Sequence, residues 1–456
     1  MKLIINTKFT LIFLSIFLAS CSSITPKPDI SPISNAQLSP NFKYDTLIEV
    51  LPKNIDYSKW WLVFNDTTLN NLIEKIEFNQ DLALAQAKYN EAISAKKQAQ
   101  SVLLPTIDIQ ASANRAKSNN QTKNNFSLSS QSNWELDLWG RIRQNIASNE
   151  YNITSSQADL DAVRLSLQIQ LAINYLNFRI IEKQLELLQN TVYEYQKSLK
   201  LTENRYNAGV IAKVDVLQAQ TQLQQANTQL TQTILSQNKL ENAIAILTNT
   251  APNNFKLDKS SNPLPNLVKI GNIQTNILQN RPDIIANLNR IYQANEQIGI
   301  AKKAYLPNIN LQAGVSSASS TLGNLFSLPN LAWSLGSALA VNLFDNGAKK
   351  AISQQAMAQY EQTVASYRQS ILTALKDIED NLAAQANLAI QLEQKNSSLQ
   401  TAYKTKQITL NQYKAGTVSY LDVSNAQNQE LSIQRDILSI QSQQYETAVN
   451  LLSYGK

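Results

Sequence analysis

Residues 205–209 read Arg-Tyr-Asn-Ala-Gly, and residues 412–416 read Gln-Tyr-Lys-Ala-Gly. The two stretches lie 207 positions apart, and at the same offset Asp215-Val216 recurs as Asp422-Val423. Because both the residue types and their spacing repeat, the sequence is interpreted as an internal duplication. The duplication decides the fold, since each element of the first half is expected again in the second.

Two long segments without glycine or proline precede these stretches. Gly140 and Gly209 are 69 positions apart, and so are Gly347 and Gly416. A single helix of that length would measure about 100 Å. Apolar residues of the first segment advance almost wholly in alternating steps of three and four, which predicts a coiled coil. They are Leu160, Val163, Leu167, Leu171, Asn174, Phe178, Ile181, Leu185, Leu188, Val192, Tyr195 and Leu199.

Shorter segments follow the two repeated stretches. Residues 210–251 and 417–454 also lack glycine and proline. Each is expected to return as a helix antiparallel to its long partner, with the turn at the Ala-Gly pair.

Four other segments alternate apolar and polar side chains, which predicts β-strands of the length that a tilted transmembrane strand needs. These segments are 107–114, 133–138, 308–316 and 333–343.

The links between these strands are predicted to be loops, at 117–125 and 316–330, and Trp139 and Phe344 lie where an interfacial aromatic girdle is expected. Four strands cannot close a barrel, and a sheet in lipid leaves no open edge. Three copies of the chain would supply twelve strands, enough for an open duct.

The N-terminus predicts export and acylation. Lys2 and Lys8 precede the apolar run 9–18, which is too short to span a bilayer, so residues 1–20 are interpreted as a cleaved signal. Leu18-Ala19-Ser20-Cys21 resembles a bacterial lipobox, and Cys21 is the only cysteine. The sequence therefore predicts a covalent diacylglycerol and an N-acyl chain on Cys21 and no other cofactor. The alternative is an ordinary secretory signal with a chance cysteine.

The predicted fold is mixed and mostly α-helical, with duplicated helical hairpins and four transmembrane strands per chain. Residues 21–59 are expected to form an acylated extended segment. Residues 60–260 and 261–456 are the two structural repeats, each with a helix, two strands and a long helical hairpin.

The composition argues against several function classes. The chain contains no histidine and no phosphate-binding, dinucleotide-binding or metal-binding motif, so it is predicted not to be an enzyme. Without Lys2 and Lys8 the chain has 38 basic and 34 acidic residues, and no basic cluster interleaved with aromatic residues, which argues against nucleic-acid binding. Glycoside chemistry by carboxylates and a structural coiled-coil lipoprotein are the remaining alternatives to a duct.

Nearly the whole mature chain resembles the TolC-like outer-membrane factors, specifically the NodT-type lipoproteins of resistance-nodulation-division efflux systems. The resemblance rests on several motifs besides the duplicated stretch. They are Trp60-Trp61 with Phe64 and Leu69, Leu104-Pro105, Leu306-Pro307, and Arg281-Pro282-Asp283-Ile284 leading to Ala294-Asn295, Ile298-Gly299 and Ala301-Lys302.

This resemblance implies a homotrimer anchored in the outer membrane lipid, with a twelve-stranded barrel continued by a helical barrel across the periplasm. It implies a periplasmic adaptor and an inner-membrane pump as partners, and it favours efflux over type I secretion. Ser22 and Ser23, with no aspartate beside Cys21, favour sorting to the outer membrane in the resembling lipoproteins.

The resemblance also implies an iris-like gate at the turns around Gly209 and Gly416. Asp422 matches a constricting carboxylate, Tyr413 a tyrosine that holds the inner coil shut, and Asp215 an acid of the neighbouring coil. Two positions depart from the pattern of some members, in which an arginine stands at Val418 and a second aspartate at Asn425. One acidic ring and a weaker ionic latch are therefore expected.

Asp422 has a second interpretation. Three Asp422 carboxylates on a narrow axis would attract cations. An aspartate in the first turn of a helix also caps that helix, whatever its position in an assembly.

Overall fold

The computed structural model describes residues 42–44, 57–259, 263–265, 267, 270, 278 and 280–454. The predicted signal at residues 1–20 and the acylation site Cys21 lie outside the described residues. The described chain divides into two compact units, and each takes elements from both predicted repeats. The first contains residues 86–159 and 283–370, and the second contains the described residues from 42 to 85, from 160 to 282 and from 371 to 454.

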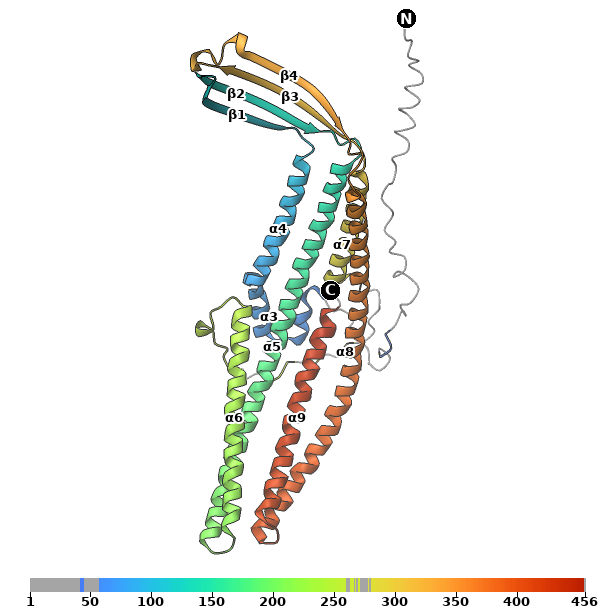
Figure 1. The fold of residues 1–456 in the computed structure, drawn as a ribbon. Helices are drawn as coiled ribbons and strands as arrows, with labels where there is room; N and C mark the ends of the chain where they lie inside the picture. The colour runs from blue at the N-terminus through green and yellow to red at the C-terminus, as the bar shows by residue number, and fades with distance from the viewer. Residues whose placement is uncertain are drawn as a thin grey trace. The chain divides into compact units, whose positions relative to one another are not determined.

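In the first unit, four strands form one antiparallel sheet in the order β1-β2-β3-β4 (Figure 1). They are β1 (Thr106–Ser118), β2 (Gln121–Glu135), β3 (Asn308–Ser319) and β4 (Leu331–Ala340). Two hairpins at equivalent places in the two repeats confirm the predicted strand pairs.

The first hairpin corrects the predicted loop at 117–125. Only Asn119 and Asn120 form the turn, with φ of 50° and 60°, and the residues on either side continue the ladder. Two consecutive left-handed residues match the right-handed twist of a hairpin, and asparagine tolerates that conformation. The sequence pattern failed here because the end of the hairpin has no apolar face to mark it as a strand.

The strands also end earlier than predicted, at Glu135 and Ala340 instead of 138 and 343. The residues that follow them start the next helices. Asp137 accepts hydrogen bonds from the backbone N–H groups of Ile142 and Arg143, at 2.9 and 3.0 Å. Asp345 accepts one from Lys349 N at 3.1 Å. Because these carboxylates satisfy the free N–H groups of a helix start, the chain leaves the sheet before them.

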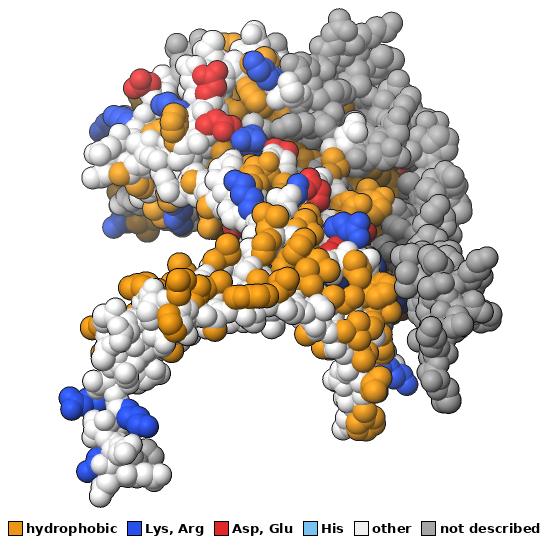
Figure 2. All heavy atoms as spheres, turned by 90° about the horizontal axis from the view of Figure 1, so that it is seen from above, with side chains coloured by type: hydrophobic (Ala, Val, Ile, Leu, Met, Phe, Trp, Pro, Cys, Tyr) orange, Lys and Arg blue, Asp and Glu red, His pale blue; other side chains and the backbone are white. Residues whose placement is uncertain are grey.

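The register divides the sheet into two faces. Directly opposed residues of an antiparallel pair point to the same side, so the pairs Ala113–Phe126 and Val315–Trp333 lie on one face. Hydrophobic side chains gather over the strands in Figure 2. The apolar face contains Ile107, Ile109, Ala111, Ala113, Phe126, Leu128, Trp134, Ile309, Leu311, Ala313, Val315, Leu331, Trp333, Leu335 and Leu339. The opposite face carries small and polar side chains.

Single helices fill the segments that lack glycine and proline, as predicted. The described helices are α3 (Thr67–Glu74), α4 (Gln80–Ser101), α5 (Arg141–Asn207), α6 (Lys213–Leu247), α7 (Pro282–Lys303), α8 (Ala348–Ala415) and α9 (Tyr420–Ser453). None of the twelve residues of the predicted seam on α5 is exposed. In the second unit, α6 runs back along α5 and α9 runs back along α8, which confirms the two hairpins (Figure 1).

In the first unit, α7 packs on the first part of α5. Tyr151 and Tyr292 stack with ring centroids 5.2 Å apart, and Arg290 pairs with Asp159 at 2.6 Å. Gly299 allows the close approach, because a Cβ there would lie 1.8 Å from the side-chain nitrogen of Gln144. The glycine of the Ile298-Gly299 motif therefore has a packing role.

In the second unit, a buried charged cluster binds the N-terminal segment to α5. Arg179 contacts Asp66 at 3.3 Å and Glu182 at 2.9 Å, and only 3% of its side chain is exposed. Tyr175 donates a hydrogen bond to Asp66 at 2.9 Å, and Asp66 also caps α3 through Leu69 N. Burial raises the pKa of Tyr175 to about 12. The cluster lies just after η2 (Tyr57–Phe64), which carries the Trp-Trp motif and packs against α9, where the Phe64 and Tyr445 rings lie 6.4 Å apart.

Candidate gate at the tips of the helical hairpins

Both hairpins of the second unit turn in the same way. Helix α5 ends with a hydrogen bond from Val210 N to Arg205 O at 3.0 Å, and α8 ends with one from Thr417 N to Gln412 O at 3.0 Å. Gly209 and Gly416 adopt φ of 72° and 83°. This is the Schellman arrangement, in which glycine takes the left-handed position after a helix. The repeated Ala-Gly pair is therefore conserved between the two repeats for the turn that it forms.

Asp422 caps the return helix α9. It accepts hydrogen bonds from the backbone N and the hydroxyl of Ser419, at 3.0 and 2.7 Å, which is a capping box. The structure thus confirms the capping interpretation of Asp422. The residue is also exposed at the tip, where its charge remains accessible. Asp215 lies at the equivalent position of α6 and is half-buried.

Tyr413 lies in a small apolar core between the tips. It is 2% exposed and meets Tyr420 edge-on, with ring centroids 5.6 Å apart. Ala219 and Val423 complete the buried core. Burial raises the pKa of the Tyr413 phenol, Asp215 raises it further, and Arg205 opposes both. Asp215 therefore lies near enough for its charge to act on the Tyr413 phenol, and both hairpins build the core around Tyr413.

Arg205 is the residue that sequence reasoning missed. Its guanidinium donates a hydrogen bond to the Tyr413 carbonyl at the end of α8 and lies 4.7 Å from the centre of the Tyr413 ring. A Cβ on Gly416 would lie 3.6 Å from this guanidinium. The contact joins the tip of the first hairpin to the tip of the second.

The weaker ionic latch stays a prediction, and Arg205 bears on it. Val418, where some members carry an arginine, packs against the apolar core around Tyr413. Arg205 of α5 places a cation beside Tyr413, at a position where the second repeat has Gln412. The available signal in the sequence was this departure from the duplication, inside a stretch whose tyrosine, alanine and glycine match.

A ladder of polar side chains continues the contact between the hairpins. Tyr420 donates to Gln222 at 3.0 Å, Gln222 donates to Gln427 at 3.2 Å, and Gln427 donates to Ser198 at 3.2 Å. All of these hydrogen bonds are buried. Each neutral hydrogen bond contributes about 1 kcal/mol. The ladder therefore stabilises the contact between the two hairpins only modestly, and the hairpins can separate.

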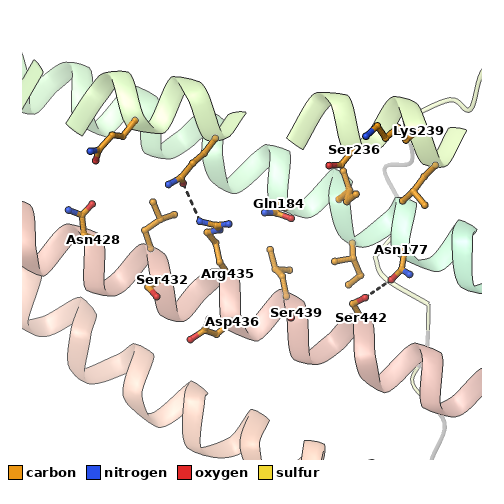
Figure 3. Close-up of a pocket in the computed structure, with 17 residues that line it drawn as sticks. Asn177, Gln184, Ser236, Lys239, Asn428, Ser432, Arg435, Asp436, Ser439 and Ser442 are labelled. Atoms are coloured by element: carbon orange, nitrogen blue, oxygen red, sulfur yellow. Dashed lines mark hydrogen bonds between the residues drawn. The ribbon is translucent and has the colours of Figure 1, made fainter. Parts of the chain in front are cut away.

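Further along the same helices, a groove of about 980 Å³ opens between α5, α6 and α9 (Figure 3). Its walls are mostly polar. Arg435 reaches Gln229 at 3.3 Å, and Ser442 hydrogen-bonds to Asn177 across the groove. The groove thus combines hydrogen-bonding side chains with apolar ones such as Ile180, Leu431 and Leu438.

The comparisons with known proteins agree with this geometry. The model of the outer membrane efflux protein family matches residues 73–250 and 274–454. The chain belongs to the outer membrane efflux protein family. The solvent efflux pump outer membrane protein SrpC of Pseudomonas putida is 31% identical over 408 residues, 85% of each chain. The probable outer membrane lipoprotein SilC of Salmonella typhimurium is 26% identical over 443 residues, 96% of this chain and 95% of that one.

Solved structures of this family share the fold. The outer-membrane channel OprN is 25% identical, with a TM-score of 0.83 over 93% of this chain and 98% of that one. The protein is therefore the outer-membrane exit duct of an efflux system and extends from the outer membrane into the periplasm. Among the described residues, no helix is long and apolar enough to cross a membrane.

Within the described part of this efflux protein, no group of histidine, cysteine, aspartate or glutamate side chains could hold a metal ion. The candidate site consists of residues at the tips of the two hairpins. Arg205, Tyr413 and Asp215 lie at one place in the second unit, and Asp422 lies at the start of the helix that leaves it.

Proposed function

We propose that three copies of this chain form a passive duct with a twelve-stranded barrel, and that the hairpin tips are its gate. The contact of Arg205 with Tyr413 carries the proposal, because it holds the α5/α6 and α8/α9 hairpins together at their ends. Parting the tips removes that contact and exposes the apolar core around Tyr413. Opening therefore requires free energy to break the Arg205–Tyr413 contact and to expose this core. Conduction itself needs no catalytic step.

Asp422 is proposed to form the acidic ring of the gate. Its bonds to Ser419 leave it exposed and fix its position at the first turn of α9. Capping and constriction are compatible, because the same carboxylate can cap α9 and also contribute negative charge at the axis of the trimeric duct.

Replacing Asp422 with asparagine is expected to reduce cation selectivity. Asparagine keeps an oxygen that accepts from Ser419, so the cap survives while the charge is lost. A cation 4 Å from a carboxylate in water gains about 1 kcal/mol, so the cation-to-anion permeability ratio should fall about fivefold. The measurement is the reversal potential of purified trimers in planar bilayers under a salt gradient.

Asp436→Asn is the matched control, because it removes the same charge from α9 at a residue that pairs with Lys395 at 2.7 Å. The control should keep the wild-type permeability ratio. If Asp422→Asn behaves like this control, the acidic ring is not at Asp422.

The partners are proposed to be a periplasmic adaptor and an inner-membrane resistance-nodulation-division pump. The relatives are named as components of efflux systems, and the groove between α5, α6 and α9 gives a polar surface for an adaptor helix. Ser439 is exposed on the wall of this groove.

A thiol placed in the groove should cross-link to the adaptor in cells. Cys21 is the only native cysteine, so Ser439→Cys introduces a single unmodified thiol if Cys21 is acylated. With a short bifunctional reagent, we expect an adduct of the size of duct plus adaptor on a denaturing gel. Ser397 is exposed on α8 and lies outside the groove. The Ser397→Cys control should therefore yield at least about tenfold less of this adduct. Equal yields from the two positions would refute docking in the groove.

Cys21 is proposed to carry the diacylglycerol and N-acyl chains that anchor the mature chain. The support is the lipobox-like Leu-Ala-Ser-Cys motif and a relative named as a probable outer membrane lipoprotein. The intact mass of the purified protein tests this directly, since an unmodified N-terminus would show no acyl mass.

A further inference from the structure

The charges at the free end of the sheet are distributed unequally between the two repeats. The β1–β2 hairpin carries Arg115, Lys117 and Lys123, and no acidic residue occurs from 109 to 134. The β3–β4 hairpin and its flanks, residues 308–344, contain no charged residue. The duplicated halves therefore differ at their outer ends, where only the first is cationic. Blue side chains gather at one end of the strands in Figure 2.

The register assigns these cations to different faces. Ala113 pairs with Phe126 on the apolar face, and Arg115 and Lys117 follow on the same side of β1. Lys123 pairs with Ala116 and lies on the small, polar face. All three side chains are exposed, and none makes an ion pair with another described residue.

The apolar face must be the side that contacts lipid, because an outer-membrane barrel has an apolar outside and a polar inside. At about 3.4 Å per residue, Arg115 and Lys117 lie about 7 and 14 Å beyond Ala113 along the strand. They are thus on the lipid side, just past the last apolar residues of β1. The helices leave the sheet at its other end, toward the periplasm, so this end faces the cell exterior.

We propose that Arg115 and Lys117 bind the phosphate groups of lipid A in the outer leaflet of the outer membrane. Charge complementarity identifies the occupant, because two cations without a local acid stand at the depth of an anionic headgroup. The arginine offers a planar pair of donors to phosphate oxygens, and the lysine adds a point charge. The inference rests only on the sheet spanning the outer membrane. It assigns a lipid-binding function to one hairpin of the duplication.

Binding is tested by native mass spectrometry of the full-length protein in detergent, titrated with bisphosphorylated lipid A. The double variant Arg115→Gln/Lys117→Gln is expected to bind it about 25-fold more weakly, at about fivefold for each cation removed. Lys123→Gln is the matched control, since it removes a cation from the same hairpin but from the other face. It should bind like the wild type.

Two further measurements separate the phosphate contact from other causes. Lipid A without phosphates should bind wild type and double variant equally. Arg115→Lys/Lys117→Arg keeps both charges and should bind within about threefold of wild type. Migration of the folded oligomer on a mild gel shows that each variant has assembled. The proposal is wrong if the double variant retains wild-type affinity, if phosphate-free lipid A binds as tightly, or if Lys123→Gln is equally impaired.

Discussion

Replacing Arg205 with alanine is expected to open the duct. The variant loses a hydrogen bond from a charged donor to the Tyr413 carbonyl and a cation–π contact with the Tyr413 ring. Together these interactions are worth about 2–4 kcal/mol per chain. If they exist only in the closed conformation, their loss shifts the closed-to-open ratio by about 30- to 1,000-fold per chain. We therefore expect a higher mean conductance and longer open times in planar bilayers.

Two variants make this experiment specific. Arg205→Lys keeps the charge but loses the planar group, so it should give an intermediate open probability. Arg435→Ala removes an exposed arginine of α9 that joins the hairpins through Gln229, away from the tips, and it should conduct like the wild type. An Arg205→Ala duct with unchanged conductance would remove Arg205 from the gate.

Replacing Arg179 with alanine is expected to have the largest effect on stability. Asp66 and Glu182 would remain largely buried without their cation, and breaking a buried ion pair in this way costs about 3–5 kcal/mol. Because Asp66 caps α3 beside the Trp-Trp motif, the N-terminal segment should come loose from α5. Trp60 and Trp61 are buried, so their fluorescence during urea unfolding in detergent reports this release.

Arg164→Ala is the natural control for this prediction. Arg164 lies on the same helix and pairs with Glu77 of the same N-terminal segment at 3.0 Å, but Glu77 is 54% exposed. An exposed pair contributes about 0–1 kcal/mol, so the urea midpoint should hardly move. Adding Asp66→Asn and Glu182→Gln to Arg179→Met should recover part of the loss, since the cost arises from uncompensated charge. Equal destabilisation by Arg164→Ala would contradict the explanation by burial.

Much of the candidate gate was accessible from the sequence. The repeated stretch marks both turns, because a helical turn is a local signal, and the resemblance to the family then assigned Asp422, Tyr413 and Asp215 to them. Arg205 was missed because its partner is 208 positions away. Nothing in the neighbourhood of Arg205 distinguishes a solvated arginine from one that contacts another hairpin. The turn at Asn119 and Asn120 was missed for a different reason, since the polar residues around it give no apolar alternation.

The sequence by itself determined the duplication, the long helices, the turns at the Ala-Gly pairs and the four alternating strands. These features depend on backbone preferences and on the periods of apolar residues, which act over a few neighbouring positions. Only the tertiary structure decided which arginine meets Tyr413 and which cations of the first β-hairpin lie on the apolar face of the sheet. Those outcomes depend on how two hairpins pack and on a strand register, and both are set by contacts between residues far apart in the chain.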